Sequence, residues 1–250
     1  MIPAVPTSTY REHPSPPALA GHVLCVWSQA IGAGESWHRH RVLPDGCADL
    51  VWIGEAPAVV AGPATGPVIV PLAPRTIVVG VRLRPGATPA LLGLPANQLS
   101  NRDTPLRDIW GAGADALSAR VIEQPSVAAR LEAAAAALAG RLAEAGPLDP
   151  MIAASTSWLA RHPEGRIAEL ARILEVGERR LRRRFALAGR APRSDLSLAA
   201  LAAEAGYADQ AHMSRELRRL TGRSPGALLP GSASTLELSD LFKTETVPAA

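Results

Sequence analysis

The stretch GYADQAHMSRELRRLTGRSP, residues 206–225, opens with a glycine turn, continues as an arginine-rich helical pattern and ends at Gly-Arg-Ser-Pro. At 100° per residue, Met213, Leu217 and Leu220 fall on one side of a helix, and we expect them to form its packed stripe. The opposite side carries small and cationic residues. A tight turn followed by a basic helix favours a helix-turn-helix, whose second helix fits the DNA major groove.

The same pattern occurs earlier in the chain. IAELARILEVGERRLRRRF (167–185) and LAALAAEAGYADQAHMSREL (198–217) both have Leu-Ala at the fourth and fifth positions, a turn about five residues later and then a basic helix. Gly-Arg-Ala-Pro follows the first and Gly-Arg-Ser-Pro the second. We therefore expect an all-α domain over 151–230, with helix-turn-helix units at 166–192 and 197–228.

The charge distribution supports this assignment. Residues 1–150 hold 11 Arg and 12 acidic residues, a net charge of −1, whereas residues 151–230 hold 14 Arg and 8 acidic residues, a net charge of +6. Residues 231–250 hold one Lys and three acidic residues, and we expect them to form a flexible tail. A cationic excess confined to one region is typical of a nucleic-acid-binding module, although solvated arginine faces are also common.

The sequence resembles AraC/XylS-type transcription regulators. AAEAGYADQAHMSRELRRLTGRSP is similar to their second helix-turn-helix, and IAELARILEVGERRLRRRF is similar to the first. RVLPDGCADLVW, VGVRLRPGATPALLGLPA and TPLRDIWG resemble the amino-terminal domain of one branch of this family. The resemblance covers roughly residues 8–229 and implies a sequence-specific regulator whose front domain senses an effector or dimerises.

The resemblance also implies which residues contact DNA. On the first recognition helix they are Arg179, Arg182 and Arg183. On the second they are Gln210, Ala211, His212, Ser214 and Arg215, and the face of this helix opposite its packed stripe adds Arg218 and Arg219 as candidates. Arg215 is suited to guanine O6 and N7, whereas Arg218 and Arg219 are suited to phosphates.

The spacing between the two units departs from the family pattern. Only RSDLS, residues 193–197, separates Pro192 from Leu198, where the family has a long linking helix. A natural deletion, a divergent spacing and a degenerate regulator are all compatible with this short segment. Binding of two adjacent major-groove segments by one chain is therefore an open question.

The front of the chain predicts an α+β protein. Residues 20–86 contain short runs of β-branched and aromatic residues broken by Pro and Gly, and they favour a cupin-like β-sandwich or barrel. Residues 87–146 have a helical pattern that completes an effector or dimerisation domain over 1–146. GPLDP, residues 146–150, cannot continue a helix and marks the domain boundary.

Two helical segments in this region have specific expectations. Asp103 or Thr104 is expected to cap a helix that has Pro105 in its first turn. In residues 126–146, Leu131, Leu138 and Leu142 form a stripe for core packing or, alternatively, for a dimer contact.

Several polar residues of the front domain could carry chemistry. His38, His40, Asp45 and Cys47 could hold a metal if extended, but a turn rich in exposed polar groups is the expected interpretation, with Cys47 buried. Arg82 and Arg84 alternate with apolar residues on one strand face. We expect them on the outer face of the sheet, with an anionic-effector pocket as the alternative.

Nothing in the sequence favours an enzyme, a cofactor or a metal site. Cys25 and Cys47 have neither disulfide-framework nor zinc-ligand spacing, although a reactive thiol is a remote alternative. No secretory signal or membrane-spanning run is recognised, so a cytoplasmic protein is expected. Trp27, Trp52 and Trp110 are expected in the core.

The expected partners are double-stranded DNA, a small-molecule effector, a second copy of the chain and, for an activator, RNA polymerase. The alternative is an effector-binding or protein-interaction module whose DNA reader no longer works.

Overall fold

The computed structural model describes residues 8–33, 37–42, 44–143, 145, 147–162 and 166–188. The second predicted helix-turn-helix unit (197–228) and the predicted tail (231–250) lie outside these residues.

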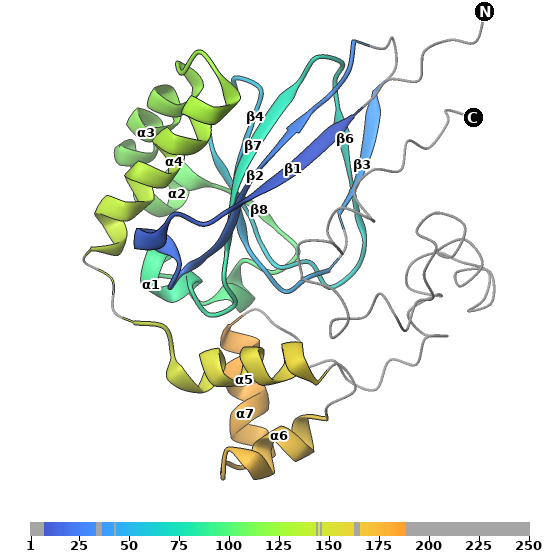
Figure 1. Ribbon diagram of the computed structural model, residues 1–250, viewed down its shortest axis with the longest axis vertical. Helices are drawn as coiled ribbons and strands as arrows, with labels where there is room; N and C mark the ends of the chain where they lie inside the picture. Colours follow the sequence, from blue (N-terminus) through green and yellow to red (C-terminus); the bar gives the residue numbers. More distant parts are fainter. Residues whose placement is uncertain are drawn as a thin grey trace, which may run out of the picture.

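Two antiparallel sheets form the front part of the described chain (Figure 1). The larger has the strand order β1-β2-β7-β4-β5-β8, and the smaller pairs β3 with β6. The strands are β1 (Thr9–Pro14), β2 (Val23–Ala30), β3 (His38–Val42), β4 (Asp49–Ile53), β5 (Val59–Ala61), β6 (Val68–Leu72), β7 (Ile77–Leu83) and β8 (Asp103–Pro105).

The helices follow the strands in the sequence. In the front part they are α1 (Thr88–Leu92), α2 (Leu106–Trp110), α3 (Ala112–Ile122) and α4 (Val127–Leu142), with the 3-10 helices η1 (Pro17–Leu19) and η2 (Ala96–Gln98). The carboxy-terminal helices are α5 (Pro150–Arg161), α6 (Ile167–Ile173) and α7 (Glu178–Leu187). An antiparallel β-rich region followed by helices confirms the α+β class.

The large sheet is the middle of three layers, with helices on one face and the β3–β6 sheet on the other (Figure 1). Alternation along each strand sends successive side chains to opposite faces. On β7, Val79 and Val81 belong to the core shared with the helices. Val78 belongs to a second core, which also contains Leu72 of β6. Both faces of the middle layer are therefore covered.

Helix α4 packs on the sheet as its leucine stripe predicts. Ser126 caps the helix, because its hydroxyl accepts a hydrogen bond from the Ala129 amide. Leu131 and Leu138 are buried in the core shared with the sheet, and Leu142 is packed at its border. The expectation of core packing for this stripe is confirmed.

Replacing one glycine of α4 should increase the stability of the protein. Gly140 is exposed, and a Cβ built there meets no heavy atom within 4 Å outside the local helix. Gly140→Ala should raise the free energy of unfolding by about 0.5 kcal/mol, because alanine loses less backbone entropy in a helix. Urea denaturation measures the change. Gly93→Ala is the control of opposite sign, because Gly93 has a φ of +71° that alanine rarely adopts.

Two boundary predictions were wrong. The β-rich region extends beyond 20–86, because β1 begins at Thr9 and pairs with β2. Asp103 and Thr104 do not cap a helix; they lie in β8, which pairs with β5, and α2 begins after Pro105. Local sequence favoured a helix cap here, but the backbone groups of this segment are used in long-range strand pairing.

Helices α5, α6 and α7 enclose a separate small core. Asp149 caps α5 by accepting a hydrogen bond from the Met151 amide, and Pro150 occupies the first turn. The helix thus begins within the segment 146–150 that the sequence marks as a boundary. Across the described ranges, no helix combines the length and the apolar character needed to span a bilayer.

Candidate nucleic-acid interface and interior polar clusters

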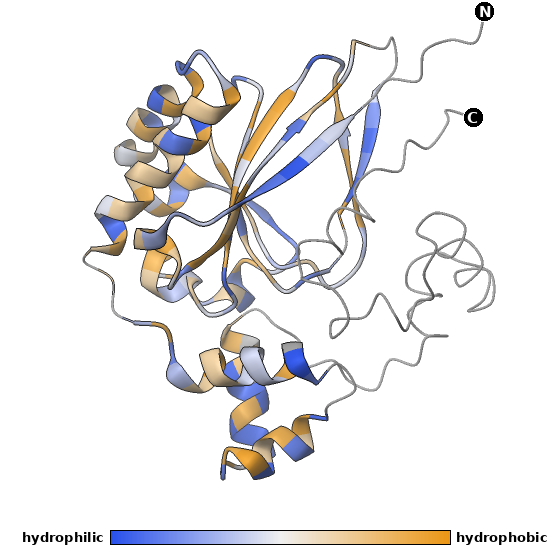
Figure 2. Cartoon of the chain, in the orientation of Figure 1, coloured by the Kyte–Doolittle hydropathy of each residue, from blue (hydrophilic) through white to orange (hydrophobic). Residues whose placement is uncertain are grey.

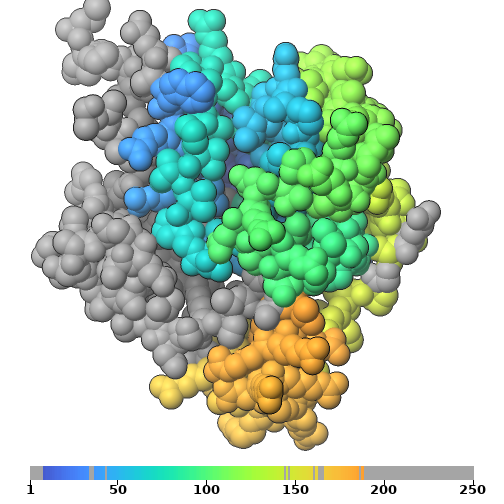
Figure 3. Space-filling model, turned by 180° about the vertical axis from the view of Figure 1, so that it is seen from behind, coloured from blue at the N-terminus to red at the C-terminus, as the bar shows by residue number. Residues whose placement is uncertain are grey.

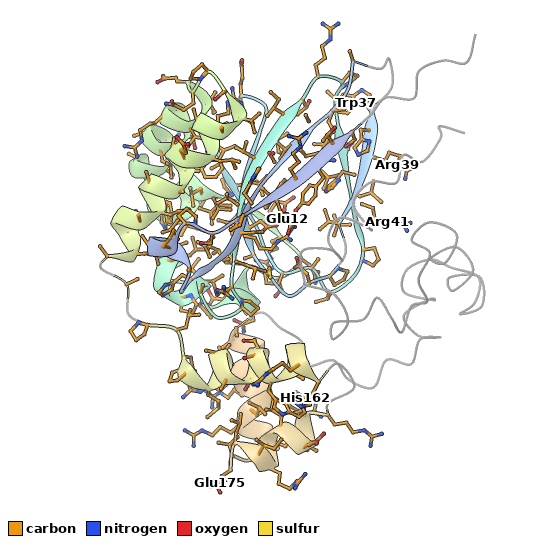
Figure 4. All side chains as sticks on the ribbon, in the orientation of Figure 1. Glu12, Trp37, Arg39, Arg41, His162 and Glu175 are labelled. Carbon is orange, nitrogen blue, oxygen red and sulfur yellow. The ribbon has the colours of Figure 1, made fainter. Side chains whose placement is uncertain are left out.

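A tight turn joins α6 to α7. Glu175 has a φ of 53°, in the left-handed region, and its amide donates to the Arg172 carbonyl at 3.2 Å. The Val176 amide donates to the Ala171 carbonyl at 2.9 Å. These bonds satisfy two carbonyls near the end of α6, and four residues separate α6 from α7. Figure 4 labels Glu175 at this turn.

The two helices are held by apolar side chains at the spacing read from the sequence. Leu181 and Phe185, four residues apart on α7, are fully buried, as is Leu170 on α6. Ile152 of α5 joins the same core. The burial of Leu181 and Phe185 fixes which side of α7 faces solvent.

That free side of α7 is strongly cationic. Arg179 and Arg183 are exposed, and each lies 200° around the helix from Leu181. Arg182 is also exposed; its Nε donates to the Glu178 carboxylate at 2.8 Å, and its Nη2 lies 2.6 Å from the same oxygen. In Figure 2, α7 alternates between hydrophilic and hydrophobic residues, as a helix with one packed side does.

Among the described residues, the carboxy-terminal helices contact the front part of the chain at η2 and at the segment after β7. The Gly86 amide, just after β7, donates to the Ala188 carbonyl at 3.2 Å. A Cβ built at Gly86 would lie 3.0 Å from Ile152, so the chain passes close to α5 as well. An ion pair joins Arg184 of α7 to Asp149. Figure 3, seen from behind, shows the orange segment that contains α7 at the molecular surface below the front domain.

The structure thus brings Arg179, Arg182 and Arg183 onto one exposed surface. The residues predicted for the second recognition helix lie outside the described residues; they are Gln210, Ala211, His212, Ser214, Arg215, Arg218 and Arg219.

A buried ionic cluster lies between the large sheet and the β3–β6 sheet. Arg82 is at its centre, 4% exposed. Its guanidinium donates to Glu12 at 2.9 Å and to Asp49 at 3.1 Å, and its Nε lies 3.4 Å from Asp45. The Tyr10 hydroxyl donates to the Glu12 carboxylate at 2.5 Å. Figure 4 labels Glu12 on β1, and its side chain is 5% exposed.

The electrostatics of this cluster follow from burial and from the three carboxylates. Burial alone would lower the pKa of Arg82, but the Asp49 and Asp45 carboxylates outweigh it and hold the pKa above its usual value. Burial raises the pKa of Tyr10, the positive charge of Arg82 opposes this rise, and the hydrogen bond to Glu12 adds to it. Tyr10 therefore stays protonated and Arg82 stays charged.

Neither sequence interpretation of Arg82 was right. Arg82 does not lie on an outer face, because the β3–β6 sheet covers the side of β7 to which it points. It is also engaged by three carboxylates, so its charge is already balanced and does not favour an anionic ligand. Arg84 is partly exposed and donates to the Ala20 carbonyl at 2.8 Å.

A second polar cluster lies in the same interior layer. His38 and His40 are 5% and 6% exposed, on the inner face of β3, and both approach Gln29 of β2. Burial lowers the pKa of His38. The prediction of an exposed polar turn was wrong for these histidines, because β3 pairs with β6 and directs them toward the large sheet. Asp45 does form a turn, accepting from the Cys47 amide at 2.9 Å.

The two cysteines and the three tryptophans named in the sequence analysis lie in apolar surroundings. Cys25 and Cys47 are buried and form no disulfide with each other. Trp52 is in the core beside the helices, and Trp27 packs in the interior layer with Tyr10. Trp110 lies at the border of the core, under the Arg141 guanidinium.

Sequence reasoning missed Glu12, Tyr10 and Gln29. Glu12 and Tyr10 lie in a strand that the local pattern did not predict, and Gln29 follows Ser28 near the end of an apolar run. The one available signal was the Tyr-x-Glu alternation of β1.

Comparison with known proteins gives one result. Residues 11–105 match a family described as "Domain of unknown function (DUF6597)". The match begins within β1 and ends at the last residue of β8, and it includes Arg82 with its three carboxylate partners as well as Gln29, His38 and His40. No curated protein matches the chain, and no solved structure matches it.

Proposed function

We propose that the chain is a sequence-specific DNA-binding transcription regulator of the AraC type. One observation carries the proposal: a tight turn joins two packed helices, and the second presents its arginines to solvent. The repeat of this pattern at 197–228 and its resemblance to AraC/XylS regulators support the same function.

The charge on α7 favours an anionic partner. Five arginines in six positions repel one another on an isolated helix, and binding to phosphates relieves that repulsion. Glu178 forms an ion pair with Arg182, and Asp149 forms one with Arg184. Arg179 and Arg183 are on the side opposite the packed residues, which is the side that a major groove would meet.

Replacing one exposed arginine tests the proposal. Arg183→Ala should weaken binding to every duplex sequence by about 1 kcal/mol, or fivefold, because it removes a phosphate contact. The slope of log K against log salt should fall by about 0.9. Fluorescence anisotropy with labelled duplexes at several salt concentrations measures both. Arg120→Ala, exposed on α3, is the matched control and should bind as the parent does.

Two results would contradict the proposal. The parent protein might show no salt-dependent affinity for any duplex, or Arg183→Ala and Arg120→Ala might behave alike. In the second helix-turn-helix, Arg215→Ala should relax specificity at one or two base pairs, whereas Arg219→Ala should weaken all sequences equally.

A second candidate is an effector-binding or protein-interaction module without a working DNA reader. The short segment RSDLS (193–197) between the two predicted units favours this candidate, because the family has a long linking helix there. In either case we propose a cupin-like sandwich that binds a small effector or a second copy, in a cytoplasmic protein. RNA polymerase is an additional partner if the regulator is an activator.

A further inference from the structure

The outer face of the small β3–β6 sheet is exposed. Successive residues of a strand point to opposite faces, and the paired His38 and Leu72 are buried on the face toward the large sheet. The alternate residues therefore point outward. They are Trp37, which immediately precedes β3, with Arg39 and Arg41 of β3 and Ile69 and Pro71 of β6. Figure 4 labels the first three at β3, on the side of the molecule opposite the helices of the front domain.

This face combines exposed apolar surface with positive charge that no described acid balances. Trp37 is 64% exposed and Ile69 is 38% exposed, two of the five large apolar side chains that are exposed in the described part of the chain. Arg39 and Arg41 form no ion pair with another described residue. Tryptophan and arginine are the residues most enriched at the centres of protein interfaces. The composition of the face is therefore that of a binding surface.

The chemistry of this face favours an acidic partner that also carries apolar side chains. Arg39 and Arg41 point the same way from one strand, and carboxylates facing them would complement their charge. A symmetric contact with a second copy would instead set these arginines against the same two arginines. A DNA duplex would supply phosphates, but it would leave Trp37 and Ile69 against a charged backbone.

The chain itself contains a segment of this composition, outside the described residues. TLELSDLF, residues 235–242, contains Glu237 and Asp240 and neither Lys nor Arg. Its apolar residues are Leu236, Leu238, Leu241 and Phe242. Residues 189–234 join it to the end of α7, and a chain of this length extends up to roughly 150 Å, which is enough to reach β3. Covalent linkage also raises the effective concentration of the segment near the face.

We propose that residues 235–242 bind to the outer face of the β3–β6 sheet of the same chain. The two acidic residues of the segment pair with the arginines of β3, and its apolar residues cover Trp37 and Ile69. The contact removes apolar surface from water and balances two positive charges, so it stabilises the small sheet. It goes beyond DNA binding and does not depend on it, because it uses neither α7 nor the residues predicted for the second recognition helix.

Photocrosslinking in the full chain tests the contact. Benzoylphenylalanine in place of Phe242 reacts with neighbouring side chains on illumination, and mass spectrometry identifies the crosslinked peptides. Crosslinks should form to residues 37–41 or 68–72. A mixture of unlabelled chains and chains labelled with nitrogen-15 separates crosslinks within one chain from crosslinks between two, and the proposal requires the former.

Charge reversal on the face tests the role of the arginines. The double variant Arg39→Glu, Arg41→Glu should lower the crosslink yield roughly fivefold or more, because each new glutamate repels the acidic segment. The matched control is Arg11→Glu, Arg120→Glu, which makes the same change in net charge at exposed positions of β1 and α3. The control should give the crosslink yield of the parent.

Exchange of the charges separates this effect from damage to the fold. Glu237→Arg and Asp240→Arg, added to the chain that carries the two glutamates on β3, should restore the crosslink, because the opposite charges then face each other again. Crosslinks to other parts of the chain, an unchanged yield after charge reversal, or no recovery after the exchange would each overturn the contact. Crosslinks between chains would assign the face to a second copy and would overturn it as well.

Discussion

Gly80→Ala is expected to lower the free energy of unfolding by about 3 kcal/mol, because the Trp27 indole occupies the space that a side chain would need. A Cβ at Gly80 would lie 2.2 Å from Cε2 and 2.6 Å from Nε1 of Trp27. Gly80 pairs directly with Trp27 on the neighbouring strand, so the indole lies across its own cross-strand partner. Trp27 is 6% exposed and packs against Tyr10, with ring centroids 5.7 Å apart.

The ring cannot move aside without separating the two sheets, because the β3–β6 layer covers this face. Urea denaturation followed by circular dichroism measures the loss. Gly66→Ala is the matched control, since a Cβ at Gly66 meets nothing within 4 Å and φ there is not in the left-handed region. Equal stability of the Gly80 and Gly66 variants would show that Trp27 does not lie over Gly80.

Arg82→Met should cost about 3–5 kcal/mol at pH 7, because it leaves buried carboxylates without their cation. The Glu12 and Arg82 side chains are each 5% exposed, and Asp49 is 16% exposed, so water does not replace the lost partner. Methionine fills much of the volume of the arginine stem. The loss of stability therefore reflects the missing charge rather than a cavity.

The pH dependence separates this effect from simple loss of packing. A buried carboxylate with no cation takes up a proton more readily than one in the unfolded chain. The folded variant therefore binds more protons, and its stability falls as pH rises. The difference in free energy of unfolding between Arg82→Met and the parent should become smaller as the pH falls from 7 to 5. Arg84→Met is the control on the same strand side and should change stability by less than about 1 kcal/mol. If the loss of stability in Arg82→Met did not vary with pH, it would not come from carboxylates left without their cation.

Much of the fold could be predicted from local pattern. The apolar runs at 22–31, 47–54 and 76–86 contain β2, β4 and β7, and the leucine stripe of residues 126–146 contains α4. The i, i+4 spacing of Leu181 and Phe185 matches the side of α7 that is buried. These elements were readable because their apolar periodicity matches the secondary structure in which they are buried.

The interior of the sandwich could not be predicted in the same way. Alternation along β7 places Arg82 and Val81 on opposite faces of the sheet. It does not indicate which face other elements cover, and in this structure both faces are covered. The burial of His38 and His40 depends on the pairing of β3 with β6, which are separated by two other strands in the sequence. The Glu12 partner of Arg82 is 70 residues away in the chain.

The amino-acid sequence alone determined where the basic helix α7 lies, which of its residues pack, and that a β-rich region precedes it, because each depends on neighbours within a few turns. Only the tertiary structure decided that Arg82, Glu12 and the histidines are buried between two sheets. The physical reason is that burial of a polar strand residue depends on which distant strand is stacked over it, and a local period does not record that choice.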